Sequence, residues 1–446
     1  MGEFDGQRVV VMGLGRFGGG LGVARWLAAQ GADTLVTDKE PEERLHESVR
    51  GLRDLVDVGR IELRLGEHNV SDFTTCDVVV VNPGVSRPWE NRFVRAGEAS
   101  GARVTTEIAL LCERLPRRER VIGVTGTSGK STTAGMIHHG LTGLGVRAHF
   151  GGNIGGSMLE SLGDIRPDDW VVLELSSAML HWLGSEASWA GAGVAVVTNF
   201  APNHLDWHGS IEHYEQSKRR LLDAQRPGDL AVLGPGVHAW ATRPGVERDE
   251  IDEGEGVGGC VLPGAHNALN AEVAARAIGA ALGRDHIEGA RAAVRSFPGL
   301  PHRLRLVHES GGVRVYDDSK STTPAATLLA VEAIAGTLER GEAGVHLIAG
   351  GYDKGIDLSA IARLGDRLGG VYAIGQTAHM LMGGERASLC ATLERAVGEA
   401  MSRAAPGDAV LLSPGCASWD QFENFEQRGR RFADLAREAG GRRRSA

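Results

Sequence analysis

A glycine-rich turn between an apolar strand and a helical pattern is the strongest sign of chemistry in this chain. Val121–Val124 is rich in β-branched residues, and the turn 126–132 follows it with the sequence Gly-Thr-Ser-Gly-Lys-Ser-Thr. In such a turn, backbone N–H groups and the next helix N-terminus converge on an anion, with Lys130 at the β and γ phosphates and Ser131 available to Mg²⁺. The usual template has glycine where this chain has Val124. A nucleoside triphosphate site is predicted, in a variant form of the motif.

Two further polar groups follow apolar strands. Glu174 lies at the end of the strand expected over 171–175, and His204 follows the strand expected over 194–197. Because parallel strands end at one edge of a sheet, we expect both side chains beside the phosphate turn. A glutamate there can hold Mg²⁺, which prefers oxygen ligands. A lone histidine is more often a cap or a packed residue, and this is the alternative for His204.

A second glycine-rich turn lies near the start of the chain. The segment Gly13-Leu14-Gly15-Arg16-Phe17-Gly18 follows an expected strand over 9–12, and Asp38 ends the next one. This pattern is the dinucleotide-binding fingerprint, which alone favours an NAD-dependent oxidoreductase. The turn itself provides only a pyrophosphate cradle and an acceptor for a ribose or base, and a UDP-sugar carries the same groups. The turn therefore does not distinguish between NAD and a UDP-sugar as its ligand.

The turn at 126–132 resembles the ATP-binding loop of the Mur ligases and the folylpolyglutamate synthases, which activate a carboxylate as an acyl phosphate. The resemblance implies that Glu174 and His204 are metal ligands. It also implies that Lys218 reacts with CO₂ to form a carbamate, whereas its bland interpretation is one charge in the solvated run 214–222. The family's usual Asn is Ser128 here, and its usual Phe-Gln after Glu-Leu-Ser-Ser is Ala178-Met179, so the substrate pocket near Met179 is expected to differ.

Later segments extend the resemblance. Residues 264–270 resemble the family's adenine-side segment, and Asn82-Pro83-Gly84-Val85-Ser86 resembles part of its UDP site. Within 301–303 and 318–322, the family places an arginine at the γ-phosphate and an Asp-Ser-Lys-x-Thr element facing ATP and the amino acid. The segments 350–355 and 412–429 resemble those of the glutamate-adding members. A cation and hydroxyl donors suit an acidic amino acid.

The residues and their resemblances imply five overlapping sets of site residues. The catalytic set is Lys130, Glu174, His204, Lys218 and Arg303. The ATP set is Gly126, Thr127, Ser128, Gly129, Lys130, Ser131, Thr132, Asn267, Asn270, Arg303 and Asp318. The UDP-substrate set is Gly13, Leu14, Gly15, Asp38, Asn82, Gly84, Ser86 and Asn153. The glutamate set is His204, Lys320, Thr322, Lys354, Ser418 and Phe425, and the metal set is Ser131, Glu174, His204 and carbamylated Lys218.

Short apolar strands alternate with helical patterns along most of the chain, which predicts an α/β protein with parallel, doubly wound sheets. We expect a Rossmann-like UDP-binding domain over 1–107, a central P-loop-type ATP-binding domain over 108–299 and a Rossmann-like amino-acid-binding domain over 300–446. The second boundary lies at the stiff segment 297–301, which contains two prolines. The acidic, glycine-rich stretch 246–259 is predicted to be an exposed loop or a weak hairpin.

Composition narrows the class of protein. With 446 residues the chain exceeds the size of one usual hydrophobic core, so more than one domain is expected. The excess of 57 acidic over 48 basic residues disfavours a nucleic-acid partner. No apolar run is long enough for a membrane helix. Five scattered cysteines without a Cys-x-x-Cys pair argue against a zinc site and against disulfides. No signal peptide is recognised, so a cytoplasmic protein is expected. A monomer is also expected.

Together, the resemblance implies ATP- and Mg²⁺-dependent addition of D-glutamate to UDP-N-acetylmuramoyl-L-alanine, through an acyl phosphate, in peptidoglycan precursor synthesis. The same charged groups can hold L-glutamate, so the chirality of the amino acid stays open. The rivals are the NAD-dependent oxidoreductase and a non-enzymatic nucleotide switch, which the motifs at 350–355 and 412–429 disfavour.

Overall fold

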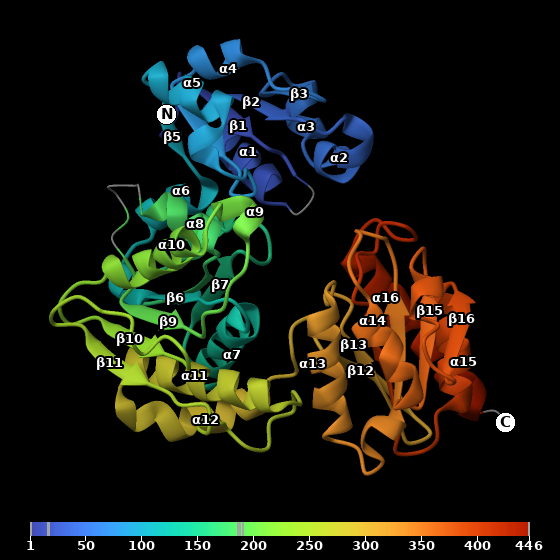
Figure 1. Cartoon of the computed structure of the whole chain (residues 1–446). Helices are drawn as coiled ribbons and strands as arrows, with labels where there is room; N and C mark the ends of the chain where they lie inside the picture. Colours follow the sequence, from blue (N-terminus) through green and yellow to red (C-terminus); the bar gives the residue numbers. More distant parts are fainter. Residues whose placement is uncertain (1, 16–17, 185–188, 190, 445–446) are drawn as a thin grey trace. The chain divides into compact units, whose positions relative to one another are not determined.

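The structure, a computed structural model, describes residues 2–15, 18–184, 189 and 191–444 (Figure 1). Its contacts divide the chain into two compact units, Met1–Glu255 with Asn270–Val294, and Gly256–Leu269 with Arg295–Ala446. The first unit holds two parallel sheets and the second holds one mixed sheet. The predicted α/β class is confirmed, and one sheet falls within each of the three expected ranges.

The first sheet has five parallel strands in the order β3-β2-β1-β4-β5. The strands are Arg8–Met12 (β1), Asp33–Asp38 (β2), Ile61–Leu65 (β3), Val78–Val81 (β4) and Arg103–Thr105 (β5). β2, β1 and β4 are the inner strands, and the valines of β1 and β4 are buried on both faces, as expected where helices cover a parallel sheet. The helices here are Gly19–Ala29 (α1), Glu42–Arg50 (α2), Arg53–Asp57 (α3), Val70–Thr74 (α4) and Arg92–Ala99 (α5). Glu107–Arg114 (α6) follows β5 and contacts both α1 and Ser177–Leu183 (α8).

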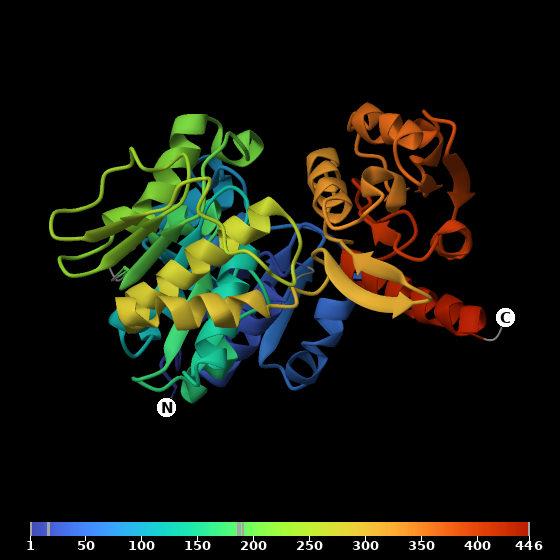
Figure 2. The same cartoon turned by 90° about the horizontal axis from the view of Figure 1, so that it is seen from below.

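The second sheet has six parallel strands in the order β11-β10-β9-β6-β8-β7. The strands are Val121–Thr125 (β6), Ala148–Gly152 (β7), Trp170–Glu174 (β8), Val194–Val197 (β9), Leu230–Leu233 (β10) and Glu247–Glu250 (β11). The helices are Lys130–Gly143 (α7), Ser177–Leu183 (α8), Leu205–His208 (α9), Ile211–Asp223 (α10), Ala265–Leu282 (α11) and Ile287–Arg295 (α12). The last two lie side by side (Figure 2), where Arg291 Nε donates to Glu272 Oε2 at 2.8 Å.

The strand β11 corrects one prediction. The stretch 246–259 was expected to be a loop or weak hairpin, yet Glu247–Glu250 pairs in parallel with β10. An edge strand needs no apolar alternation, because its charges can remain in water or find partners nearby. Here Arg276 of α11 pairs with Asp249 at 2.8 Å, and Arg248 pairs with Glu250 at 2.6 Å.

The sheet of the second unit has the order β12-β13-β17-β14-β15-β16, in which β12 and β13 are antiparallel and the other pairs are parallel. The strands are Arg305–Ser310 (β12), Val313–Asp317 (β13), Val345–Gly350 (β14), Gly370–Ile374 (β15), Ala387–Ala391 (β16) and Ala409–Leu412 (β17). The helices are Pro324–Ala335 (α13), Ser359–Ala362 (α14), Leu393–Arg403 (α15) and Phe425–Arg444 (α16). Helix α16 packs along β12 and β13 (Figure 2).

The predicted motifs follow the carboxyl ends of strands. Gly13 follows β1, Gly126 follows β6 and Asp318 follows β13, while Glu174 is the last residue of β8. This is the edge where ligands bind in open α/β sheets, so the fold places the motifs where chemistry is expected. Among the described residues, no helix has both the length and the apolar character needed to cross a membrane.

Candidate active site

The turn between β6 and α7 has the backbone conformation that an anion cradle requires. Gly126 has φ 147°, and Gly129, the N-cap of α7, has φ 79°, values that L side chains rarely adopt. A Cβ on Gly126 would lie 1.9 Å from Thr198 Oγ1, so only glycine fits there. Within the turn, Lys130 Nζ donates to the Thr127 carbonyl at 2.9 Å. Glycine thus lets the chain fold tightly ahead of the helix N-terminus.

Three side chains outside the predicted set fix the shape of this turn. Asn199 Oδ1 accepts from the Ser128 N–H at 2.9 Å, and Thr198 Oγ1 donates to the Ser128 carbonyl at 2.6 Å. The Tyr214 hydroxyl lies 3.1 Å from Thr127 Oγ1. Thr198 and Asn199 follow β9, which pairs with β6. Their place after an adjacent strand was the available signal, but the sequence did not reveal their contacts.

Glu174 lies beside the phosphate turn with one oxygen unpaired. It ends β8, whose register pairs it with Val124 of β6, and its side chain is only 2% exposed. Its Oε1 accepts from Asn153 Nδ2 at 3.2 Å. Its Oε2 is buried and has no hydrogen-bond partner within the described part of the chain. A buried carboxylate oxygen left without a donor is costly, and a cation would satisfy it.

Lys218 lies in the same cluster. It projects from α10, is 1% exposed, and donates through Nζ to the Gly126 carbonyl at 2.6 Å. Burial, followed by the positive charge of Lys130, lowers its pKa well below the ordinary value, and Glu174 opposes that shift. The structure therefore brings together Lys130, Glu174 and Lys218, which the sequence spaces far apart.

His204 also borders this cluster. It is the N-cap of α9, with φ 52°, and its N–H donates to Asn203 Oδ1 at 2.8 Å. Partial burial lowers its pKa, and the charges of Lys130 and Lys218 lower it further. A neutral imidazole is the form that binds a metal ion. The four predicted catalytic residues of the first unit are thus electrostatic neighbours.

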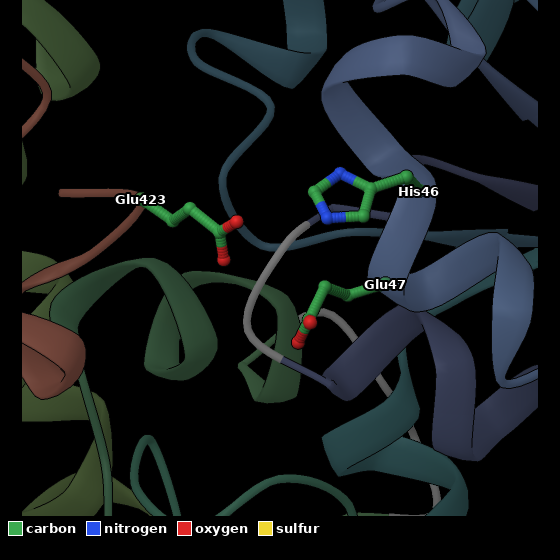
Figure 3. Close-up of side chains that lie close together, drawn as sticks. All are labelled: His46, Glu47 and Glu423. Carbon is green, nitrogen blue, oxygen red and sulfur yellow. The ribbon is translucent and has the colours of Figure 1, made fainter.

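A different set of possible ligands lies on α2. Figure 3 shows His46 and Glu47 as neighbours on this helix and also draws Glu423, which belongs to the second unit. The His46 and Glu47 side chains are both exposed. Two exposed ligands from one unit are too few for a metal centre, and no site is assigned to them.

Helix α11 carries the two predicted adenine-side asparagines, which make different contacts. Asn270 faces the phosphate turn, since Thr133 Oγ1 donates to its Oδ1 at 3.4 Å, and a Cβ on Gly129 would lie 2.5 Å from that oxygen. Asn267, one turn earlier, is buried and donates through Nδ2 to the Pro263 carbonyl at 2.6 Å. Asn270 therefore also limits the space around the turn.

The N-terminal turn is closed by predicted site residues. The Gly15 N–H donates to Asp38 Oδ2 at 3.0 Å, and Asn82 Nδ2 donates to the Gly13 carbonyl at 3.2 Å. The Gly84 N–H in turn donates to Asn82 Oδ1 at 2.8 Å. The Leu14 side chain is fully buried, so only its backbone can face a ligand. Ser86 is exposed in the same loop, while Arg16 and Phe17 lie outside the described residues.

In the second unit, the turn that carries Arg303 is held against Asp317 and Asp318. His302 Nδ1 lies 2.6 Å from Asp317 Oδ2, and the Leu304 N–H donates to Asp318 Oδ1 at 3.1 Å. The other Asp318 oxygen accepts from Ser413 Oγ at 2.8 Å. Burial raises the pKa of Asp318 to about 6. Asp318 thus joins the loop that carries Arg303 to the loop that begins at Ser413, both within the second unit.

Of the six predicted glutamate residues, Lys320, Thr322, Lys354 and Ser418 lie on loops after neighbouring strands of the second unit, and Phe425 begins α16 there. His204 instead follows β9 in the first unit. Lys320 Nζ lies 5.1 Å from the Phe425 ring centroid, and Lys354 Nζ lies 4.4 Å from that of Trp419, which follows the buried Ser418. Thr322 is half-buried in the Lys320 loop.

The buried Arg428 joins two of these loops. It donates to the Ser319 carbonyl at 2.8 Å and to the Cys416 carbonyl at 3.2 Å. Trp419 and Arg428 were not predicted as site residues.

Comparison with known proteins gives three consecutive family matches. They are the MurD-like N-terminal domain of Mur ligases over residues 7–105, the Mur ligase middle domain over 124–239, and the Mur ligase glutamate ligase domain over 302–416. The UDP-N-acetylmuramoylalanine--D-glutamate ligase of Acidobacterium capsulatum is 34% identical, over 97% of this chain and 96% of that protein. The chain belongs to the Mur ligase family.

Further relatives and solved structures also match this Mur ligase over nearly its whole length. The UDP-N-acetylmuramoylalanine--D-glutamate ligase of Roseiflexus sp. is 36% identical, over 96% of this chain and 98% of that protein. Among solved structures, the UDP-N-acetylmuramate-alanine ligase of Thermotoga maritima matches with a TM-score of 0.61 at 19% identity, covering 97% of this chain and all of that one. The MurF ligase of Thermotoga maritima in complex with ADP matches with a TM-score of 0.57 at 17% identity, covering 98% and 99%. The two structures show the shared fold.

Proposed function

We propose that this Mur ligase uses ATP to join D-glutamate to UDP-N-acetylmuramoyl-L-alanine, in the cytoplasmic synthesis of peptidoglycan precursors. The observation that carries the chemistry is the buried, unpartnered Glu174 Oε2 beside Lys218 and the phosphate turn. The substrates follow from near full-length relatives that are named for this reaction. The same relatives favour D- over L-glutamate, the alternative that the site chemistry alone leaves open.

The phosphate turn positions the triphosphate in this proposal. Its backbone N–H groups and the N-terminus of α7 bind the β and γ phosphates, and Lys130 exchanges the Thr127 carbonyl for a phosphate oxygen. Asn270, next to Gly129, lies on the adenine side together with Asn267 of the same helix. The remaining members of the ATP set are proposed with the roles that the family resemblance implies.

A Mg²⁺ ion fits the donors present. Glu174 offers a buried oxygen with no donor among the described residues. The lowered pKa of His204 favours its neutral imidazole, which is the form that binds a metal ion. These two residues and Ser131 would hold the ion. Bound there, it would neutralise charge on the phosphate oxygens.

The reaction has two steps. A carboxylate oxygen of the alanyl substrate attacks the γ-phosphorus and ADP leaves, which gives an acyl phosphate. The neutral amine of glutamate then attacks the acyl carbon, phosphate leaves, and the amine proton passes to a base or to water. Lys130 and Arg303 stabilise charge on the transferred group, so orientation and electrostatics provide most of the catalysis.

Lys218 is proposed to carry a carbamate. A neutral amine adds CO₂ and releases one proton, and the lowered pKa of Lys218 favours the neutral amine. The carbamate would be an anion close enough to interact with the charge of Lys130, and it would turn an uncharged amine into a partner for the metal site. The hydrogen bond from Lys218 Nζ to the Gly126 carbonyl already directs the side chain to the phosphate turn.

The loops of the second unit are proposed to hold glutamate. Lys354, Thr322 and Ser418 bind its carboxylates, Lys320 adds positive charge, and Phe425 shapes the pocket. The division at 107/108 and 299/300, the UDP site on the N-terminal turn and the monomeric state remain parts of the same proposal.

A phosphate-release assay tests the proposal directly. The protein is incubated with ATP, Mg²⁺ and UDP-N-acetylmuramoyl-L-alanine, and with D-glutamate, L-glutamate or D-lysine in separate reactions. We expect phosphate and the amide product with D-glutamate, and loss of both in Lys130→Met. No phosphate release with any of the amino acids, together with NADH binding, would favour the oxidoreductase instead.

A further inference from the structure

Two indoles and two imidazoles meet beside the loop that carries Asn82, within the first unit. Trp89 follows this loop, and its ring makes an edge contact with His213 at a centroid distance of 4.6 Å. It also lies 5.2 Å from His181 and 5.9 Å from Trp207. We call Trp89, His181, Trp207 and His213 the Trp–His clasp. It joins the N-terminal part of the unit to helices α8, α9 and α10.

Trp207 adds hydrogen bonds to these ring contacts. Its Nε1 donates to the Pro83 carbonyl at 3.0 Å, and its own carbonyl accepts from the Arg87 N–H at 3.3 Å. The residue is 8% exposed, so both bonds are shielded from water. The segment from Pro83 to Arg87 is therefore fastened at its two ends to one residue of α9.

The same residue leads to the catalytic cluster. His204 is the N-cap of α9, three residues before Trp207. On the other side, Asn82 precedes Pro83 and donates to the Gly13 carbonyl in the N-terminal turn. A continuous set of contacts thus runs from the glycine turn at 13–15, through Pro83 and Trp207, to His204.

The surroundings of the clasp favour uncharged imidazole rings. Burial lowers the pKa of His181 to about 4, and the positive charge of Arg220 contributes to that shift. Burial likewise lowers the pKa of His213. Neutral rings can pack edge to face with indoles without the cost of burying a charge.

From these contacts we propose that Trp207 and Trp89 are positioning residues that fix the Asn82–Ser86 loop relative to His204, and thereby set where the sugar nucleotide lies. This inference rests on the proposed function, because it assigns the loop to that substrate. Neither tryptophan is required to touch the reacting atoms. Their effect should therefore appear in the binding of one substrate.

Trp207→Phe is the sharpest test, because it deletes the Nε1 donor and keeps an aromatic ring. We expect the KM for UDP-N-acetylmuramoyl-L-alanine to rise about threefold to tenfold, as loss of one shielded hydrogen bond implies. The KM values for ATP and D-glutamate should stay within about twofold of wild type. The bond that is lost holds the Pro83 loop, which is assigned to the sugar nucleotide and not to the other two substrates. Equilibrium dialysis of the sugar nucleotide without ATP should show the same loss of affinity.

Trp26→Phe is the matched control, since Trp26 is a buried indole of the N-terminal part that contacts Phe4 outside the clasp. It should leave all three KM values unchanged. Trp89→Leu should weaken the same substrate, and its combination with Trp207→Phe should cost less than the product of the two single effects. An unchanged sugar-nucleotide KM in Trp207→Phe, or equal increases in all three KM values, would overturn the clasp. If wild-type protein releases no phosphate, the proposed function itself fails, whatever the clasp does.

Discussion

Gly129→Ala tests the geometry of the phosphate turn. Gly129 has φ 79°, and an L residue in the left-handed region costs about 1–2 kcal/mol. The added Cβ would also lie 2.5 Å from Asn270 Oδ1, which is inside van der Waals contact, so the turn or Asn270 must move. A displacement of about 1 Å in a positioning element can cost about 100-fold in rate. We therefore expect kcat/KM for ATP to fall at least about tenfold.

Gly145→Ala supplies the control. Gly145 lies just beyond the other end of α7, with φ 77° and with nothing described within 4 Å of its ideal Cβ. It carries the same backbone strain without the clash. Gly129→Ala should lose at least as much stability in urea unfolding as Gly145→Ala, because it adds the clash to the same strain, but only Gly129→Ala should lose activity in phosphate release at varied ATP. Wild-type kinetics in Gly129→Ala, or an equal loss in Gly145→Ala, would refute the role assigned to the turn.

Three further changes have defined outcomes. Tyr214→Phe removes the hydroxyl beside Thr127 and should raise the KM for ATP about threefold to tenfold. The control Tyr372→Phe loses a hydrogen bond to the buried His346 of the second unit and should leave this KM unchanged, so equal effects of the two changes would exclude a specific role of Tyr214 in the phosphate turn. Lys218→Ala should lose activity that small carboxylic acids partly restore and carbonate does not, with Arg219→Ala as the neighbouring control; full activity in Lys218→Ala would rule out the carbamate. Burial raises the pKa of Asp318 to about 6 from an ordinary 3.8, so the folded state binds the proton more tightly than the unfolded state. Relative to Asp318→Asn, the free energy of unfolding of the wild type should fall by about 2–3 kcal/mol as the pH rises from about 4 to about 7, and parallel pH profiles would contradict this.

The sequence predicted the parts of the fold that repeat a local pattern. Valine runs such as β4, followed by turns and helices, indicated parallel sheets, and the motifs at Gly126 and Glu174 were correctly assigned to strand ends. The edge strand β11 was missed because its Glu-Arg-Asp-Glu sequence has no apolar alternation, and only its pairing with β10 defines it. Local pattern is a weak guide where tertiary contacts decide the structure.

The same limit applies to the candidate site. Lys130 and Lys218 were predicted from motifs, and the structure places them close enough for their charges to interact. The contacts of Asn199 and Tyr214 with the turn were not predictable, because both depend on how separate strands and helices meet. Trp207 likewise has no motif that announces its bond to Pro83.

The phosphate turn owes its shape to segments remote from it in the chain. Thr198 and Asn199 bind Ser128 from the end of β9, while Asn270 approaches Gly129 from α11. A protein engineer who transplanted residues 126–132 alone into a foreign strand–helix junction would leave those braces behind. A functional graft of this nucleotide-binding element would have to include three parts of the chain, held in their present arrangement.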